Sequence, residues 1–304
     1  MSIIHWKAAL AKTAKSMLAG IFLALLSFSP ALADGIPHAW GLGLQNPGSA
    51  IETRIYDFHS MLLFIISAVT ILVLVLLIWV IIRYNKGVNP QPSRVTHNMK
   101  LEVIWTLIPC LIVLSIAWVS FPLLYFMDRM PNPDLTLKVT GHQWYWSYEY
   151  PDNNDISFDS LAIWNSPDIT QAQADAAVKE DSVNWLIKDK PLRMLEVDNR
   201  VVLPVGKVVR VQITGADVLH SWFVSSLGVN RMAVPGRLNE VWFKIDKPGI
   251  YYGQCSMICG NGHGYMPIVI EGVSSDQFDA WVAAKKKAAD NSGTAAHIFM
   301  AAAK

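Results

Sequence analysis

Charged residues are scarce in this sequence, and their scarcity narrows the possible functions. Asp, Glu, Lys and Arg make up 16% of the 304 residues, the formal net charge is +1, and 52% of the residues are hydrophobic. A chain without a strongly basic surface is not expected to bind nucleic acid. The balance instead indicates a membrane protein with a water-exposed part.

Cysteine is also rare, with three residues in the whole chain. Three cysteines do not build a network of disulfides. Cys110 stands alone in an apolar run, where we expect a small buried hydrophobic residue. Cys255 and Cys259 lie four positions apart, a spacing that outside the cytoplasm is typical either of a disulfide or of a metal site.

Acidic and basic residues are missing altogether from two long segments, 58–82 and 103–127. Each is long enough to cross a hydrocarbon core of about 30 Å as a helix, and we expect Pro109 and Pro122 to kink the second. The intervening residues 83–100 include four basic side chains and no acidic one. Short cationic loops stay in the cytoplasm, so both long ends of this hairpin should face outside.

The first 33 residues have the pattern of a secretory signal. Lysines precede a short apolar stretch, and Ala31-Leu32-Ala33 supplies the small residues of a cleavage point. A first membrane anchor is the alternative, although the apolar stretch is short for a span. After cleavage the chain would begin at Asp34, with a periplasmic surface segment over 34–57 ahead of the hairpin over 58–128.

From residue 135 onward the pattern changes to short β-strands. Alternating or β-branched runs stand beside Pro and Gly, with no helical period between them. We therefore expect an antiparallel sandwich or barrel over 129–272, interrupted by a polar insertion over 164–190. A short helix that begins near Ser275 and a loosely ordered tail should follow over 273–304.

Side chains that bind soft metals gather in the β-rich part: His220, Cys255, Cys259, His263 and Met266. Thiolates, imidazoles and a thioether select copper over hard cations. A single blue-copper site needs one Cys, two His and a weak Met, so the additional thiolate predicts two copper ions bridged by two sulfurs. A covalently attached haem is excluded, because it requires Cys-x-x-Cys directly before the histidine, and the segment 259–263 has only Cys259 before His263.

Aromatic residues dominate the segment 141–150, which contains Trp144-Tyr145-Trp146. Packing on the core would explain most of them, whereas a partly exposed indole would be able to couple a partner's cofactor to the copper. Acidic residues accompany them: Glu149, Asp152, Asp155, Asp159, Asp198 and Asp217. Such acids are ordinarily a solvated surface, and their functional use would be to steer a basic partner toward the site.

Together these motifs resemble subunit II of the haem-copper cytochrome c oxidases of bacterial or mitochondrial type. The resemblance covers nearly all of the mature chain and rests on the two spans, the Trp-Tyr-Trp run, Glu-Val-Asp-Asn-Arg at 196–200, His220 and the Cys/Cys/His/Met loop. It implies a two-helix transmembrane hairpin followed by an all-β, cupredoxin-like Greek-key barrel. It also implies a multi-pass protein of the bacterial inner membrane whose N- and C-termini are periplasmic.

The resemblance implies a binuclear copper (Cu-A) centre whose two ions are bridged by the two cysteines of the loop. His220 and Met266 would complete one copper, and His263 with the backbone carbonyl of Met257 would complete the other. The family carries Glu where this chain has Met257, and that Glu helps to bind magnesium or manganese at the boundary with subunit I. We therefore expect an intact copper centre and a weakened or absent magnesium site.

The same resemblance gives roles to residues outside the loop. Trp144 would receive the electron from cytochrome c, with Gln143, Glu149, Asp198 and Asp217 on the docking face. Electrons would continue to the haem and copper of subunit I, where oxygen is reduced and protons are pumped. The implied partners are subunit I, subunit III, cytochrome c and the membrane, so this chain would be enzymatic only as a subunit.

Glu102, at the cytoplasmic start of the second span, has two interpretations from the residues alone. An acid in the first turn of a helix interacts favourably with the helix dipole. An acid at a membrane edge also marks many proton pathways. The resemblance favours the second interpretation, because the family has an acid at the mouth of such a pathway.

Two other functions use some of the same residues. A membrane-anchored copper chaperone would use the cysteine pair and a histidine, but it would need neither Met266 nor the aromatic and acidic face, and it usually has one span. A quinol-oxidase subunit that kept the fold and lost copper is a structural alternative. The presence of all five ligand side chains argues against that alternative.

Overall fold

The computed structural model describes residues 40–91, 93–163, 192 and 194–287. These residues belong to one compact unit. The predicted signal at 1–33 and insertion at 164–190 lie outside the described residues, as does the predicted tail beyond residue 287.

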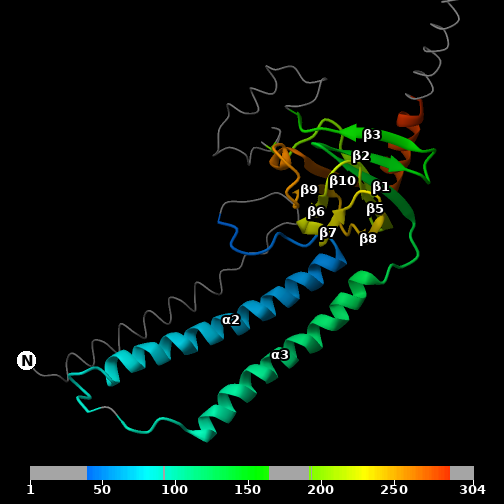
Figure 1. Ribbon diagram of the computed structural model, residues 1–304. Coiled ribbons are helices and arrows are strands. Elements are labelled where there is room, and N and C mark those ends of the chain that lie inside the picture. The colour runs from blue at the N-terminus through cyan, green and yellow to red at the C-terminus, as the bar shows by residue number, and fades with distance from the viewer. Residues whose placement is uncertain (1–39, 92, 164–191, 193, 288–304) are drawn as a thin grey trace, which may run out of the picture. The chain divides into compact units, whose positions relative to one another are not determined.

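Two long apolar helices come first, α2 (Ala50–Arg83) and α3 (Met99–Asp128) (Figure 1). By length and composition both are able to cross a membrane, and no residue in the most apolar stretch of either helix is buried within the described chain. Cys110, which we expected to be buried, is therefore exposed on α3. Its surroundings in this helix are the outward-facing apolar side chains that a bilayer or another subunit would cover.

Both helices begin before the charge-free segments from which they were predicted, because each has a polar N-cap. The Ser49 side chain accepts a hydrogen bond from the backbone N–H of Glu52, and the Asn98 side chain accepts from the N–H groups of Lys100 and Leu101. Such caps satisfy backbone donors that the first helical turn leaves without partners. The helices therefore extend past the apolar runs into polar residues.

The β region contains ten strands among the described residues, in two five-stranded sheets with the orders β3-β2-β1-β5-β8 and β4-β10-β9-β6-β7. The strands of the first sheet are β1 (Leu135–His142), β2 (Tyr145–Tyr150), β3 (Ile156–Ser160), β5 (Val208–Gly215) and β8 (Asn239–Lys244). Those of the second are β4 (Val201–Pro204), β6 (His220–Val224), β7 (Val229–Ala233), β9 (Gly249–Cys255) and β10 (Pro267–Val273).

The strand directions differ in part from the antiparallel arrangement that we expected. β1 pairs with β5 in parallel, and β10 pairs with β4 in parallel, while the other neighbours are antiparallel. Parallel partners require a long connection, and both of these pairs join strands that are far apart in the sequence. Local patterns do not reveal such pairings.

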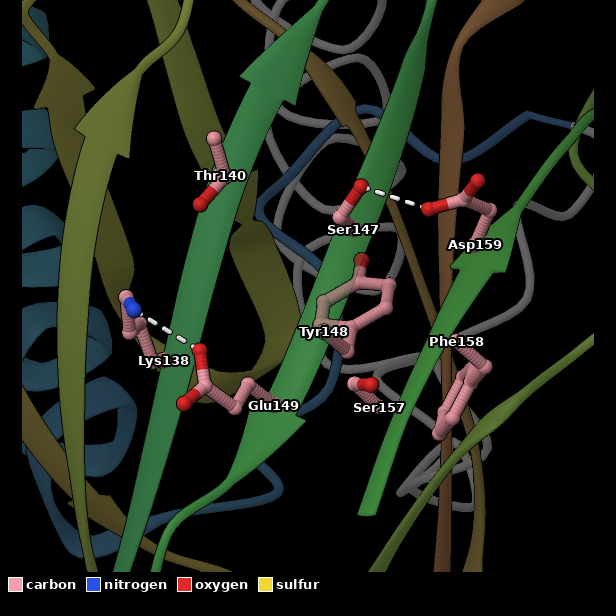
Figure 2. Close-up of a pocket in the computed structure, with 8 residues that line it drawn as sticks. All are labelled: Lys138, Thr140, Ser147, Tyr148, Glu149, Ser157, Phe158 and Asp159. Atoms are coloured by element: carbon pink, nitrogen blue, oxygen red, sulfur yellow. Dashed lines mark hydrogen bonds and ion pairs between the residues drawn. The ribbon is translucent and has the colours of Figure 1, made fainter. Parts of the chain in front are cut away.

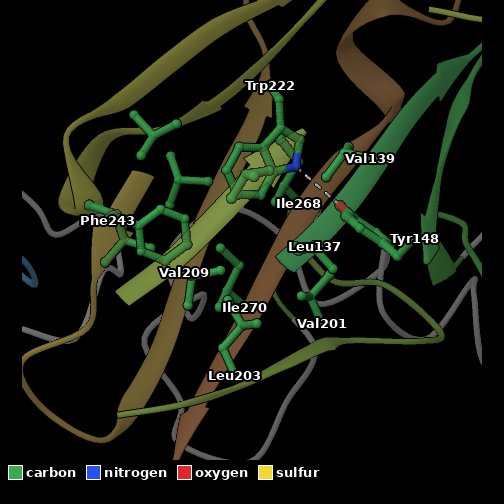
Figure 3. Packing of buried hydrophobic residues seen from close by; sticks show 14 of the residues in the cluster. Leu137, Val139, Tyr148, Val201, Leu203, Val209, Trp222, Phe243, Ile268 and Ile270 are labelled. Carbon is green, nitrogen blue, oxygen red and sulfur yellow. Dashed lines mark hydrogen bonds between the residues drawn. The ribbon is translucent and has the colours of Figure 1, made fainter. Parts of the chain in front are cut away.

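The hydrophobic core is built by inward-facing side chains of both sheets (Figure 3). Side chains alternate between buried and half-buried positions along β1 and β5, as expected for strands with one face on the core. The first sheet contributes Leu137, Val139, Tyr148, Val209 and Phe243, and the second contributes Val201, Leu203, Trp222, Ile268 and Ile270. Burial of one such side chain stabilises the fold by about 1.5–3 kcal/mol.

The ends of both helices that adjoin the β region are bonded to it. The Ser49 hydroxyl donates to the carbonyl of Leu227 at 2.8 Å, and Ile51 is buried in the same core as the strands. At the end of α3, the Trp242 indole N–H donates to the carbonyl of Met127 at 3.1 Å. The β region is therefore held to both helices at the same end of the hairpin.

Residues 275–287 form a helix that packs on the first sheet. Its cap is Ser274, one position earlier than predicted, since the Ser274 hydroxyl accepts from the backbone N–H of Gln277 at 3.3 Å. Trp281 packs against Tyr150 with ring centroids 5.2 Å apart, and against Phe158 at 6.2 Å.

Candidate metal centre

Strand pairing brings the first two donors together. His220 begins β6 and Cys255 ends β9, and these strands are neighbours, with Trp222 opposite Cys255. The chain then leaves the sheet in a loop and returns through the short helix η3 (His263–Tyr265) to Met266. Because β10 pairs with β9 directly after the loop, Met266 returns to the level of Cys255.

The five predicted ligand side chains converge on one place. The ligand atoms of His220, Cys255 and Cys259 all lie within 4.8 Å of one another. The Sγ atom of Cys259 is 3.9 Å from Sγ of Cys255, 3.7 Å from Nδ1 of His263 and 3.6 Å from Sδ of Met266. Both cysteines are free and buried, and their sulfur separation is about twice the 2.05 Å of a disulfide.

Met257 points its backbone toward this cluster. The carbonyl oxygen of Met257 lies 3.2 Å from Sγ of Cys255. The side chain of Met257 is half-buried and carries no oxygen. The carbonyl is therefore available to a metal at the thiols whatever the side chain, whereas the predicted loss of a magnesium ligand stays a prediction.

The His220 ring has the bonding pattern of a metal ligand. It is fully buried, and its Nε2 lies 2.8 Å from Oδ1 of Asp217, so a neutral ring carries its proton on Nε2. Its Nδ1 is buried without a hydrogen-bond partner. A buried acceptor without a donor is costly, and metal-bound histidines regularly donate their other N–H to a carboxylate. This orphaned nitrogen fits a metal ion.

The electrostatics of the two thiols differ. Burial alone would raise the pKa of Cys255, but the His220 ring and the backbone of Ser221 and Met257 hold that pKa below its usual value. For Cys259, burial and the neighbouring Cys255 raise the pKa. One thiolate therefore forms readily, and the second requires a cation close by, which is how metals bind cysteine pairs.

Asp217 contributes more to this cluster than the predicted docking role requires. Burial alone would raise its pKa, but its bonds to His220 and to the backbone of Val218 and Gln143 lower it. The backbone N–H of Gln143 donates to its Oδ2 at 2.7 Å. A carboxylate three residues before a ligand histidine was the available sequence signal for this orienting role.

Trp144 lies against the metal loop. Its indole N–H donates to the carbonyl of Cys259 at 3.2 Å, and the Gln143 amide donates to the same oxygen at 3.0 Å. The peptide bond between these two residues is cis. A Cβ atom on Gly262 would lie 2.4 Å from ring atoms of Trp144, so only glycine lets the indole approach the loop this closely.

A second glycine clears space behind the ligands, and neither glycine was singled out from the sequence. A Cβ on Gly141 would lie 3.0 Å from both the His220 ring and the Trp146 ring. Trp146 is fully buried, and its indole N–H donates to the carbonyl of Met266 at 3.1 Å. Trp146 therefore contacts two of the predicted ligands, His220 and Met266, although its place in the aromatic segment predicted only packing on the core.

The remaining predicted site residues lie outside the metal cluster. Glu149 pairs with Lys138 at 2.7 Å in a shallow polar pocket of about 430 Å³ over β1, β2 and β3 (Figure 2). Asp198 accepts from the backbone N–H groups of Leu161 and Asn199, at 2.8 and 2.7 Å, and so orders its own loop. Glu102 lies in the first turn of α3 and lines a separate groove.

The fold and this donor set define a class of protein: a membrane-anchored all-β protein with a buried cysteine–histidine metal centre. Known families give a closer assignment. Residues 37–123 match the transmembrane domain of cytochrome c oxidase subunit II, and residues 135–273 match its periplasmic domain. The chain belongs to the family of cytochrome c oxidase subunit II.

Individual relatives agree with this assignment. A probable cytochrome c oxidase subunit 2 of Rickettsia bellii is 45% identical over 88% of this chain and 93% of its own length. Cytochrome c oxidase subunit 2 of Cereibacter sphaeroides is 40% identical over 82% of this chain and 81% of its own. The solved periplasmic domain of subunit II of the Bradyrhizobium japonicum oxidase is 45% identical, with a TM-score of 0.43, covering 52% of this chain and 98% of its own.

The family confirms several predictions. The fold class is confirmed as a two-helix membrane hairpin followed by a cupredoxin-like β domain. The relatives are named as subunit 2 of cytochrome c oxidase, and the family is one of copper-binding oxidase subunits. The chain is therefore a membrane protein and a subunit of an oxidase, with a group of residues suited to a metal ion.

Proposed function

We propose that this chain is the electron-accepting subunit of a respiratory cytochrome c oxidase. It would take electrons from cytochrome c at a binuclear copper centre and pass them to the haem-copper site of subunit I, where oxygen is reduced to water and protons are pumped. The observation that carries this proposal is the convergence of five soft or imidazole donors beneath an indole that is bonded to the same loop.

The donor set supports two ions rather than one. Cys255 and Cys259 face the same point at 3.9 Å, which suits two thiolates that bridge a pair of metals. His220 and Met266 would complete one copper, and His263 with the carbonyl of Met257 the other. Two copper ions held in this way would take up and release one electron at a time. Asp217 would keep the His220 ring oriented throughout.

Trp144 is the proposed site at which the electron arrives. Its side chain is half-buried, so part of it is accessible to a partner, while its N–H is bonded to the backbone of Cys259. The route from the protein surface to the copper would therefore consist of one hydrogen bond and one residue. Gln143, bonded to the same carbonyl, would hold that route in place.

The acidic surface around Trp144 supports docking of a basic protein such as cytochrome c. Asp217 is exposed next to Gln143, and burial together with Asp159 and Asp217 raises the pKa of the Tyr145 hydroxyl. Glu149 and Asp198 would add to this field, although the Lys138 ammonium already offsets the charge of Glu149. Steering of this kind raises the association rate more than the affinity.

The hairpin supports a bacterial inner-membrane location with both termini in the periplasm, after removal of a signal over 1–33. Glu102 would then stand at the cytoplasmic mouth of a proton pathway, beside Thr106 and Cys110 in a groove of about 390 Å³. Subunits I and III would cover the exposed apolar faces of the helices. With Met257 in place of an acid, magnesium would bind weakly or not at all at the boundary with subunit I.

Replacement of Trp144 tests the proposal in the assembled oxidase. We expect Trp144→Phe to slow electron transfer from cytochrome c by about 10- to 100-fold, because the bonded route to the loop is interrupted. The copper spectrum and reduction by a small redox dye should stay unchanged. Tyr145→Phe is the matched control and should transfer electrons at the normal rate. Normal transfer in Trp144→Phe would contradict the proposed route.

A further inference from the structure

A mostly apolar groove of about 450 Å³ lies where α3 leaves its apolar segment and meets β8. Its lining includes Pro122, Tyr125, Phe126, Arg129, Met130 and Trp242, and Arg129 is the one charged residue in it. The N–H of Trp242 is already bonded to the carbonyl of Met127, so the indole offers the groove only its apolar surface. The groove is therefore mostly apolar and includes one cationic side chain, that of Arg129.

A second arginine reaches the same place from the other helix. The guanidinium carbon of Arg54 in α2 lies 3.5 Å from the centre of the Phe126 ring, and that of Arg129 lies 5.9 Å from the centre of the Tyr125 ring. Both arginines are exposed, and within the described part of the chain neither forms an ion pair. The acids nearest to them along the two helices are Glu52 and Asp57 in α2 and Asp128 in α3, and these also form no ion pair within the described residues.

The positions of Arg54 and Arg129 along the hairpin indicate which part of a membrane would surround them. Arg54 precedes the charge-free segment that begins at residue 58, and Arg129 follows the one that ends at residue 127. With the charge-free segments across the hydrocarbon core, both guanidinium groups would lie at the level of the lipid headgroups, and Pro122 and Tyr125 at the level of the acyl chains. Exposed arginines beside aromatic rings are typical of this interface.

We propose that this groove binds one anionic phospholipid of the leaflet on the side of the β region. Its phosphate would accept hydrogen bonds from Arg54 and Arg129, whose planar guanidinium groups suit phosphate oxygens. Its acyl chain would lie along Pro122, Tyr125 and Phe126. The lipid would connect the two helices to β8 without a direct side-chain ion pair. This site depends on the membrane hairpin and not on the copper centre.

The test uses the full chain in phosphatidylcholine vesicles that contain a minor fraction of phosphatidylglycerol with a photoreactive acyl chain. Labelling within residues 122–131 is measured by peptide mass spectrometry. We expect strong labelling by this probe and weak labelling by a phosphatidylcholine probe of the same chain. Arg54→Gln and Arg129→Gln should each lower labelling by the anionic probe about fivefold.

Arg83→Gln is the matched control, because Arg83 also stacks near a tyrosine at a helix end, 5.8 Å from the Tyr84 ring centre, but outside this groove. It should leave labelling of 122–131 unchanged, and unchanged thermal unfolding should verify that all variants are folded. Equal labelling by the two probes, or arginine variants that label normally, would overturn the proposal. Protection of 122–131 from both probes in the assembled oxidase would also overturn it and would show that another subunit covers the groove.

Discussion

The hairpin and the metal-binding β domain use apolar residues in opposite ways. In α2 and α3 the most apolar stretches contain no buried residue within the described chain, whereas Leu137 and other strand residues of the β domain are completely buried. The ability of the helices to cross a membrane depends on their length, their hydropathy and the charge at their ends. The metal centre of the β domain depends on individual contacts between side chains, so that a single added carbon atom would displace a ligand or the indole beside it. Substitutions should therefore have very different consequences in the two regions.

The largest difference is expected for the cysteines. Cys259→Ser should abolish the two-copper spectrum and reduce bound copper from two ions per chain to one or none, because a bridging thiolate is lost. Cys110→Ser, in the exposed face of α3, should leave both unchanged. Metal analysis and absorption spectroscopy of the full chain compare the variants. Equal copper content in the two would remove the proposed role of Cys259.

Replacing a leucine by alanine should destabilise the protein much more in the β domain than in the helices. Leu137→Ala in β1 should lower the free energy of unfolding of the β domain by about 2–5 kcal/mol, because it leaves a cavity in a fully buried core. Leu76→Ala in α2, where the side chain is 54% exposed, should change it by less than about 0.5 kcal/mol. Denaturant unfolding in detergent measures both, and a similar loss in each would contradict the comparison.

Within the metal loop, two glycines should behave differently. Gly262→Ala should displace Trp144, since the new Cβ would lie 2.4 Å from its ring, and should destabilise the domain by about 1–3 kcal/mol. Gly264→Ala meets no atom closer than 3.7 Å and should be tolerated. Thermal unfolding and electron transfer from cytochrome c report the two effects. A well-tolerated Gly262→Ala would show that the indole is not seated on this glycine.

The smallest effect on stability is expected for a substitution on the surface of the β domain. Gln212 and Arg210 on β5 donate to the Glu240 carboxylate on β8 and lower its pKa below the usual 4.5. A lowered folded-state pKa stabilises the protein above the unfolded-state pKa, and this contribution is lost as the pH falls through the acidic range. In Glu240→Gln the free energy of unfolding should therefore depend less on pH below about pH 4.5. Denaturant unfolding at a series of pH values measures this.

Much of this architecture could be predicted from the sequence, because it depends on composition and period. The absence of charge in 58–82 and 103–127 located the helices, and alternation indicated strands. The soft donors of the loop indicated copper before any geometry was known. These signals are local, or depend on side-chain chemistry alone.

Other features depend on contacts between distant residues and left no local signal. The parallel pairing of β1 with β5, the bond of the Gln143 backbone to Asp217, and the close approach of Gly262 to Trp144 all join separate parts of the chain. Cys110 was expected to be buried, because an apolar neighbourhood in sequence resembles a core. In a helix that faces a membrane, that neighbourhood indicates exposure to lipid instead.

The central claim is the two-copper centre, and the most direct test is copper stoichiometry combined with an electron-spin spectrum of the full chain. The donor set of His220, Cys255, Cys259, His263 and Met266 predicts two coppers per chain that share one unpaired electron, with a purple colour. A single copper with a blue-copper spectrum, or a chain that binds no copper as a disulfide forms, would contradict the account.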